Sequence, residues 1–241
     1  MSFFDKFSRR FNKRYNKTNF KAGDLILEDT PLTRSKMSDT MIRNEQFIAP
    51  RKIDNRDLCL ASSNQLQTPH CAGYSTAGYI EVQNWKKLHY PQQVNGDAIY
   101  KEAKTLDNFS GDGTYLWAAI KGAEKLGMIK GSGKSVKTNR QDIQFALHEY
   151  TVCLAGFMIT DDWNYVDLKN GIIKNSGRNA KPLGGHAILL CGYDDVGVYI
   201  QNSWGTTWGV YGFAILGWEQ FDSQLHSAMV VIPPKCAVCG N

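Results

Sequence analysis

Cys71, His186 and Asn202 are the residues whose types and order in this chain suggest covalent catalysis. A thiolate attacks a carbonyl carbon, and a histidine that accepts the thiol proton supplies that thiolate. Asn202 follows His186 by sixteen residues, across a hydrophobic run, so its amide would lie one strand away and could orient the imidazole. A cysteine followed by a distant histidine and asparagine is typical of a thiol nucleophile assembled in space.

Each of these residues also has a plain structural interpretation. A free cysteine is usually an inert buried thiol, asparagine is common in turns, and Trp204 is consistent with ordinary core packing. The combination favours catalysis, because Trp204 would cover the hydrogen bond between His186 and Asn202 and strengthen it by excluding water. Gly184 and Gly185 before His186 would let the backbone approach closely.

The segment that follows Cys71 has the pattern of a long, mostly buried helix. Apolar and small residues recur at helical spacing from Cys71 to about Leu88, and Pro69 suits a helix start. Cys71 should therefore lie in the first turn, where the partial positive charge of the helix N-terminus favours the thiolate over the thiol.

The rest of the chain changes from helical patterns to strand patterns near its middle. We expect further helices at 97–106, 115–126 and 140–149, a loop at 130–137, and strands at 151–160, 186–193, 198–202, 213–216 and 228–232. Helices followed by strands predict an α+β fold, with a cleft between the two halves.

The segment at 202–213 reads NSWGTTWGVYGF and is preceded by GHA at 185–187. This combination resembles the papain-like (cathepsin-type) cysteine peptidases, and the resemblance covers about 53–232. It implies a two-lobed fold, with an N-terminal helical lobe around a long central helix, a C-terminal antiparallel β lobe, and an active-site cleft between them.

The resemblance also implies a role for each candidate residue. Cys71 would be the nucleophile, His186 the base and then the acid, and Asn202 the group that orients His186. Gln65 lies six residues before Cys71, which is the spacing of the family's oxyanion-hole glutamine. Gly113 and Thr114 match the cleft edge that pairs with the substrate backbone, and the predicted substrate-binding set is Gly113, Thr114, Gly185 and Trp204.

Four positions depart from the family pattern. Thr114 replaces the second glycine of the substrate edge, so we expect a narrower cleft there, and Ala72 stands where the family usually has tryptophan. Gly185 occupies a position where plant members often carry aspartate. Thr68 replaces the cysteine of a disulfide that is usual in secreted members. The first three departures affect subsite shape and rate rather than the catalytic pair.

The net charge of +5 belongs to one end of the 241-residue chain. Residues 1–22 carry seven Lys or Arg and one Asp, whereas the remainder is close to neutral, so no basic nucleic-acid-binding face is expected. The N-terminus lacks the features of a signal peptide, and cysteine usage favours a reducing compartment. We therefore expect a cytoplasmic protein, or one exported without a conventional signal peptide.

Residues 1–22 form a basic amphipathic arm in this interpretation, with Phe4, Phe7, Phe11 and Tyr15 on one helical face. The arm could pack locally on the protein's own body, cover the active-site cleft, or contact a membrane surface or partner. Residues 23–52 would be a linker or short propeptide-like segment with one short strand at 25–27, and residues 53–241 the peptidase domain.

Cys236 and Cys239 end the chain as a single CxxC pair. One such pair lacks the four ligands of a structural zinc site, so a metal, a disulfide and free thiols all remain open for it. We predict no metal and no cofactor for the peptidase domain.

The sequence thus predicts a cysteine endopeptidase that hydrolyses protein or peptide substrates through a thiolate–imidazolium pair and an acyl-enzyme. Two alternatives stay open. The same residues could transfer an acyl group to, or deamidate, one specific protein, or the fold could serve as a non-catalytic protein-binding module.

Overall fold

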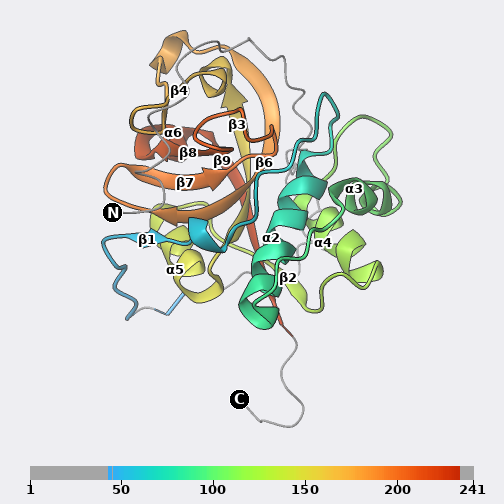
Figure 1. The fold of residues 1–241 in the computed structure, drawn as a ribbon. Coiled ribbons are helices and arrows are strands. Elements are labelled where there is room, and N and C mark those ends of the chain that lie inside the picture. Colours follow the sequence, from blue (N-terminus) through green and yellow to red (C-terminus); the bar gives the residue numbers. More distant parts are fainter. Residues whose placement is uncertain (1–42, 45, 234–241) are drawn as a thin grey trace.

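The computed structural model describes residues 43, 44 and 46–233, which form a helical side and a sheet side (Figure 1). Helices α2 (Cys71–Leu88), α3 (Gly96–Lys104) and α4 (Leu116–Lys125) pack together on one side. Strands from the second half of the chain form the other side, with α2 lying against β6 (Pro182–Tyr193). The predicted α+β fold is confirmed.

Helix α2 begins at Cys71 and ends at Leu88, as its apolar pattern predicts. Its buried residues include Ala72, Ala77 and Ile80, which face the other helices and the sheet. His89 adopts a left-handed conformation with φ of 53° and ends the helix. The basic residues Lys86 and Lys87 lie in the last turn, where they complement the negative end of the helix dipole.

Glycines let α3 and α4 approach their neighbours closely. A Cβ atom on Gly73 of α2 would lie about 2.3 Å from the backbone oxygen of Gly96, at the start of α3. A Cβ on Gly122 of α4 would lie 3.0 Å from the backbone nitrogen of Ala103 in α3. The helical lobe therefore packs backbone against backbone, and this packing fixes the first turn of α2, where Cys71 lies.

We predict that Gly73→Ala lowers the free energy of unfolding by about 1–3 kcal/mol, because the added methyl group has to displace the backbone of α3. Urea denaturation of the two proteins measures this difference. Gly217→Ala is the matched control, since a Cβ atom there meets nothing within 4 Å. Equal losses in both variants would show that helix contact is not the cause.

The strands of the described residues belong to one sheet of nine strands. Its order is β2-β9-β3-β6-β7-β8-β5-β4, and β1 pairs with β6 outside this path. All pairs are antiparallel except β5 with β8, which is parallel. The strands not yet placed are β1 (Ile53–Asp54), β2 (Ser132–Ser135), β3 (Cys153–Thr160), β4 (Val166–Asp167), β5 (Ile172–Ile173), β7 (Gly197–Gln201), β8 (Phe213–Gly217) and β9 (Leu225–Ile232).

Two apolar clusters cover the two faces of this sheet. One contains buried residues of α2 and α4 with Leu189 and Tyr199 of the sheet. The other contains Ile188 and Leu190 of the sheet, together with buried residues of α5 (Arg140–Tyr150) and α6 (Trp218–Gln224). Neighbouring residues of β6 alternate between these clusters, so this strand is buried on both faces and holds a fixed position between the lobes.

The structure corrects several local predictions. The stretch 130–137 is not only a loop, because β2 lies within it and pairs with β9. Strand β6 begins at Pro182, four residues before the predicted start, and α6 was not predicted at all. The parallel pair of β5 with β8 is an exception to the expected antiparallel lobe. The short strands β1, β4 and β5 were not predicted either, and the other predicted helices and strands agree with the structure to within three residues at each end.

Several predictions lie outside the described residues: the arm at 1–22, the short strand at 25–27 and the pair Cys236 and Cys239. Strand β1 does begin at Ile53, where the peptidase domain was expected to start. Within the described residues, none of the helices has the length and apolar character needed to span a membrane.

Candidate active site

The thiol of Cys71 lies at the junction between the two lobes. Cys71 is the first residue of α2 and is fully buried. The backbone N–H of Ala187, in β6, donates a hydrogen bond to its Sγ atom at 3.4 Å. This N–H and the helix N-terminus both direct positive partial charge at the sulfur, and both favour its thiolate form.

His186 precedes Ala187 in β6, so the contact between Cys71 and Ala187 brings the imidazole to the same junction. Its Nε2 atom lies 2.9 Å from Oδ1 of Asn202. The backbone N–H of Ser203 also donates to this Oδ1, at 2.8 Å, which identifies it as the amide oxygen. Because that oxygen only accepts, Nε2 carries the hydrogen and Nδ1 of the neutral ring holds the lone pair.

The Nδ1 atom of His186 is buried and has no hydrogen-bond partner among the described residues. Nδ1 is thus the ring nitrogen that remains available to accept a proton while Nε2 is bonded to Asn202. Burial lowers the pKa of His186 to about 4, although the hydrogen bond with Asn202 opposes this shift. The imidazole is therefore neutral near pH 7 unless a nearby negative charge, such as a thiolate, stabilises its protonated form.

Tryptophan rings enclose the bond between His186 and Asn202. The ring of Trp204 lies 4.8 Å from that of His186, centroid to centroid, and Trp204 is 1% exposed. Trp163, in the 3-10 helix η3 (Asp161–Asn164) after β3, has its ring centroid 6.2 Å from that of His186 in an edge-on contact, and Trp208 packs on Trp204 at 5.6 Å. The buried ring of Trp204 therefore lies beside the imidazole and shields it from solvent.

Gln65 lies beside this group but its amide is already engaged. Its backbone N–H donates to the carbonyl of Ser203, and its Oε1 atom accepts from Oγ of Ser203 at 2.5 Å. Its Nε2 atom donates to the carbonyl of Thr68 at 2.7 Å, which uses one of its two hydrogens. The loop that leads to Cys71 is thus joined to the segment that follows Asn202.

Gly113 and Thr114 are buried and belong to a loop held by one charged side chain. The ammonium group of Lys104 lies 3.1 Å from Oδ2 of Asp107 and 3.1 Å from the carbonyl of Gly113. The hydroxyl of Thr114 donates to the same Oδ2 atom at 2.6 Å. The hydroxyl of Thr114 thus points towards the loop interior. Comparing Thr114 only with the glycine of the family pattern did not predict this bond. Gly185, in β6, is half-buried.

His70 contacts the helical lobe rather than the imidazole of His186. Its Nδ1 atom lies 2.6 Å from Oδ1 of Asp97, and its ring stacks on Tyr100 with centroids 3.8 Å apart. His70, the sequence neighbour of Cys71, therefore joins the start of α2 to α3.

Glu81 is a buried carboxyl group that sequence reasoning missed. It lies three turns along α2 from Cys71 and is 4% exposed, and its Oε1 atom accepts from the backbone N–H of Val94 at 2.9 Å. It lines a cavity of about 20 Å³ together with Ala187, Gln201 and Asn202. Burial raises the pKa of Glu81 to about 7, against the opposing effect of the Val94 N–H.

We predict that Glu81→Gln stabilises the protein at pH 8 by about 2 kcal/mol and has no effect near pH 4. The folded state holds the Glu81 proton up to about pH 7, whereas the unfolded chain loses it near pH 4.5. Stability of the wild type therefore falls as pH rises through this window. Urea denaturation of wild type and Glu81→Gln at both pH values measures the difference in their free energies of unfolding. A difference that does not change with pH would contradict the raised pKa of Glu81.

The described residues contain no group of three or more His, Cys, Asp or Glu side chains placed to hold a metal ion. The residues near the candidate site that the sequence analysis missed are Glu81, Lys104, Asp107 and Trp163. None of them lies in a motif, and only the i, i+3 spacing of Lys104 and Asp107 is a local signal of their contact.

A helical lobe and a sheet lobe that bring a thiol, an imidazole and an amide together define a papain-like α+β fold. Residues 100–231 match the family described as papain family cysteine protease, which is more than half of the chain. The chain belongs to this family. The matched residues include His186 and Asn202 but not Cys71. The structure places Cys71 against Ala187, the residue that follows His186.

Solved structures share the fold at low sequence identity. Xylellain, a cysteine protease from Xylella fastidiosa, is 18% identical with a TM-score of 0.72, covering 93% of this chain and 100% of that chain. Procathepsin B S9 from Trypanosoma congolense is 14% identical with a TM-score of 0.68, covering 89% and 87%. Digestive procathepsin L 3 of Tenebrio molitor larval midgut is 13% identical with a TM-score of 0.62, covering 89% and 76%. No curated protein sequence matches the chain.

Proposed function

We propose that this protein is a cysteine endopeptidase in which Cys71, His186, Asn202 and Gln65 carry out peptide hydrolysis. The observation that carries the proposal is the meeting of Cys71 and the strand of His186, through the N–H of Ala187 at 3.4 Å from Sγ. Family membership supports the reaction class, and the orientation of the imidazole by Asn202 supports the roles.

In the first half of the reaction, the proton of Cys71 passes to Nδ1 of His186 and the sulfur attacks the peptide carbonyl carbon. The negative charge that develops on sulfur favours the protonated imidazole, which offsets the low pKa that burial gives His186. The protonated Nδ1 then gives its hydrogen to the amine that leaves, and a thioester remains on Cys71. Asn202 holds the ring throughout, through Nε2.

In the second half, water attacks the thioester carbonyl while Nδ1 of His186 accepts its proton, and the acid product leaves as Cys71 recovers. The second amide hydrogen of Gln65 and the backbone N–H of Cys71 are the donors proposed for the oxyanion. Because Cys71 and His186 are fully buried here, neighbouring groups have to move apart before a substrate carbonyl reaches Sγ.

The substrate edge proposed for this reaction is the loop with Gly113 and Thr114. The contacts of Lys104 with Asp107 and Gly113 fix the loop backbone, which is the part that would pair with an extended peptide. Backbone pairing accepts many sequences, so this feature favours peptide substrates without selecting a particular side chain.

Mass spectrometry of the products separates this proposal from its rivals. The purified protein is incubated with an unfolded protein substrate and with a synthetic peptide containing glutamine and lysine. Internal cleavage with addition of one water at each new pair of ends is the expected result. Loss of ammonia without cleavage would favour deamidation, and a crosslinked product would favour acyl transfer. An unchanged substrate mixture would favour a non-catalytic binding module.

A further inference from the structure

Two thiols outside the proposed active site lie in contact. Cys59 packs against the apolar cluster that contains the buried Cys191, and both are free cysteines. Cys59 follows the short 3-10 helix η2 (Arg56–Leu58), and Cys191 lies in β6, five residues after His186. The two residues are 132 positions apart in the chain, so only the fold brings them together.

Backbone pairing holds the two thiols in this arrangement. Strand β1 pairs with β6 next to Cys191, and the N–H of Asn55 donates to the carbonyl of Cys191 at 2.8 Å. The chain then turns through η2, and the thiol of Cys59 lies 3.7 Å from the carbonyl of Asn55. Cys191 in turn lies 3.5 Å, from sulfur to oxygen, from the carbonyl of Tyr199 in β7. Strand pairing and the turn at η2 therefore hold the backbone that carries each of the two cysteines.

The two thiols differ in exposure. Cys191 is fully buried, whereas Cys59 is only partly buried. Burial and the contact with Cys59 raise the pKa of Cys191 well above that of an ordinary thiol. A reagent from solution therefore meets Cys59 first, and Cys191 reacts afterwards with whatever is bound there.

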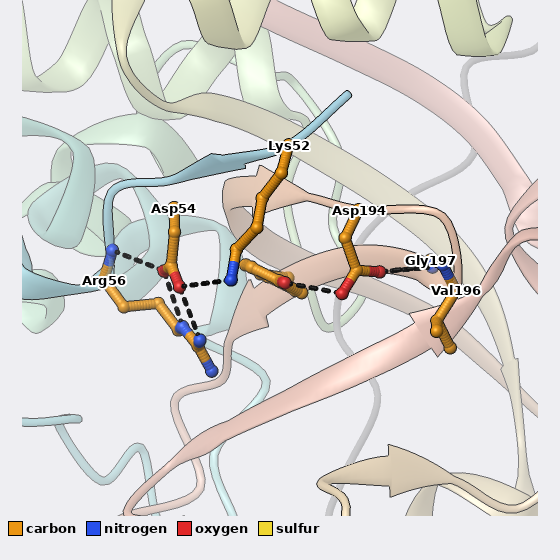
Figure 2. Close-up of polar contacts among 7 residues, drawn as sticks. Lys52, Asp54, Arg56, Asp194, Val196 and Gly197 are labelled. Carbon is orange, nitrogen blue, oxygen red and sulfur yellow. Dashed lines mark hydrogen bonds and ion pairs between the residues drawn. The ribbon is translucent and has the colours of Figure 1, made fainter. Parts of the chain in front are cut away.

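Charged groups of the segment that leads to Cys59 act on this pair, and Figure 2 shows their contacts with one another. The guanidinium of Arg56 forms two bonds of 2.7 Å with the carboxylate of Asp54, and Lys52 lies 3.7 Å from the same carboxylate. The positive charge of Arg56 favours a thiolate at Cys191, whereas the negative charge of Asp54 disfavours it. Arg56 also covers the ring of Tyr199 at 4.3 Å.

We propose that Cys59 and Cys191 form a site for thiol–disulfide exchange, which takes a low-molecular-mass disulfide such as oxidised glutathione and ends in an intramolecular Cys59–Cys191 bond. In the first step the thiolate of Cys59 attacks one sulfur of the small disulfide and releases one small thiolate. In the second step Cys191 gives up its proton and attacks the sulfur of Cys59, which releases the second small thiol. The two protein thiols are oxidised, and one small disulfide is reduced to two thiols.

The new bond would join the segment before Gln65 to the strand of His186 without using either residue. Cys153 is a useful internal comparison, because it is fully buried in β3 and its thiol contacts the backbone carbonyl of Met229 rather than another cysteine. An exchange that depends on the pair should leave Cys153 reduced, since a lone buried thiol meets neither the reagent nor a resolving partner.

The test uses the full chain with Cys71→Ser, Cys236→Ser and Cys239→Ser, which leaves only Cys59, Cys153 and Cys191 as thiols. Replacing Cys71 also removes an ambiguity, since no Lys or Arg separates it from Cys59 and trypsin leaves both in one peptide. The protein is incubated with oxidised glutathione, quenched with acid, digested and mapped by mass spectrometry. The expected result is a Cys59–Cys191 crosslinked peptide, lost on reduction, with Cys153 free.

Two further variants in the same background identify the order of the steps. Cys191→Ser should hold a stable glutathione adduct on Cys59, and Cys59→Ser should leave Cys191 reduced while the protein stays folded. A protein that keeps all three thiols, or that carries only a glutathione adduct on Cys59 while Cys191 is intact, would overturn the proposal. A link that includes Cys153 would overturn it as well.

Discussion

Cys71→Ser is expected to abolish peptide hydrolysis, with a fall in kcat of about 10⁴-fold or more. The serine hydroxyl keeps the position of the thiol at the start of α2 but gives up its proton far less readily. The N–H of Ala187 and the helix N-terminus help a thiolate that already exists, and they cannot ionise a hydroxyl near pH 7. Initial rates on a fluorogenic peptide, with wild-type and variant protein at matched concentration, measure the fall.

Cys59→Ser is the matched control for this experiment. It makes the same chemical change twelve residues earlier, at a partly buried thiol that lies outside the proposed catalytic group. Its activity should stay within about twofold of the wild type, because surface and partly buried polar substitutions usually have small effects. Wild-type rates in Cys71→Ser would remove Cys71 from the mechanism, whatever the fold.

His186→Gln is expected to lower kcat/KM by about 10³-fold or more, because the acceptor for the thiol proton and the donor to the leaving amine are lost together. Glutamine can keep a hydrogen bond with Asn202, so the change tests the proton transfer rather than the packing under Trp204. The residual rate should rise with pH towards the ordinary cysteine pKa of about 8.5. A stopped assay over several pH values measures both effects.

His148→Gln provides the comparison, since this histidine lies exposed in α5, beside Glu149 and Phe47 and outside the proposed catalytic group. It should retain wild-type activity and pH dependence. If both histidine variants lost activity to the same extent, a general loss of folding would explain the result and the proton-transfer role of His186 would fail. Circular dichroism on each variant shows whether the fold is kept.

The elements that carry the site could be predicted where local and global signals agree. Helix α2 matches its predicted limits because small and apolar residues recur at helical spacing from Cys71 and the chain turns at His89. Strand β2 could not be predicted, because its residues Ser132–Ser135 are polar and glycine-containing. That strand exists because it pairs with β9, which lies almost one hundred residues later. The parallel pair of β5 and β8 depends on tertiary contact in the same way.

The site shows the same division. The types and spacing of Cys71, His186 and Asn202 indicate their chemistry in the sequence. The structure places Cys71 next to the strand of His186. The residues around them could not be predicted. Glu81 and Trp163 lie in no motif, and their contacts are with residues distant in the sequence. The engaged amide of Gln65 was also unforeseen, since its partner Ser203 comes from the other lobe.

Labelling with a peptidyl vinyl sulfone tests the central claim most directly, which is that the fold makes the thiol of Cys71 reactive through His186. The reagent is added near pH 6 to folded wild type, to urea-unfolded wild type and to folded His186→Gln, and each adduct is mapped by mass spectrometry. We predict an adduct on Cys71 alone in the folded wild type, formed about 100-fold faster or more than in the other two samples. Equal labelling rates in all three samples, or an adduct spread over Cys59 and the other cysteines, would contradict the account.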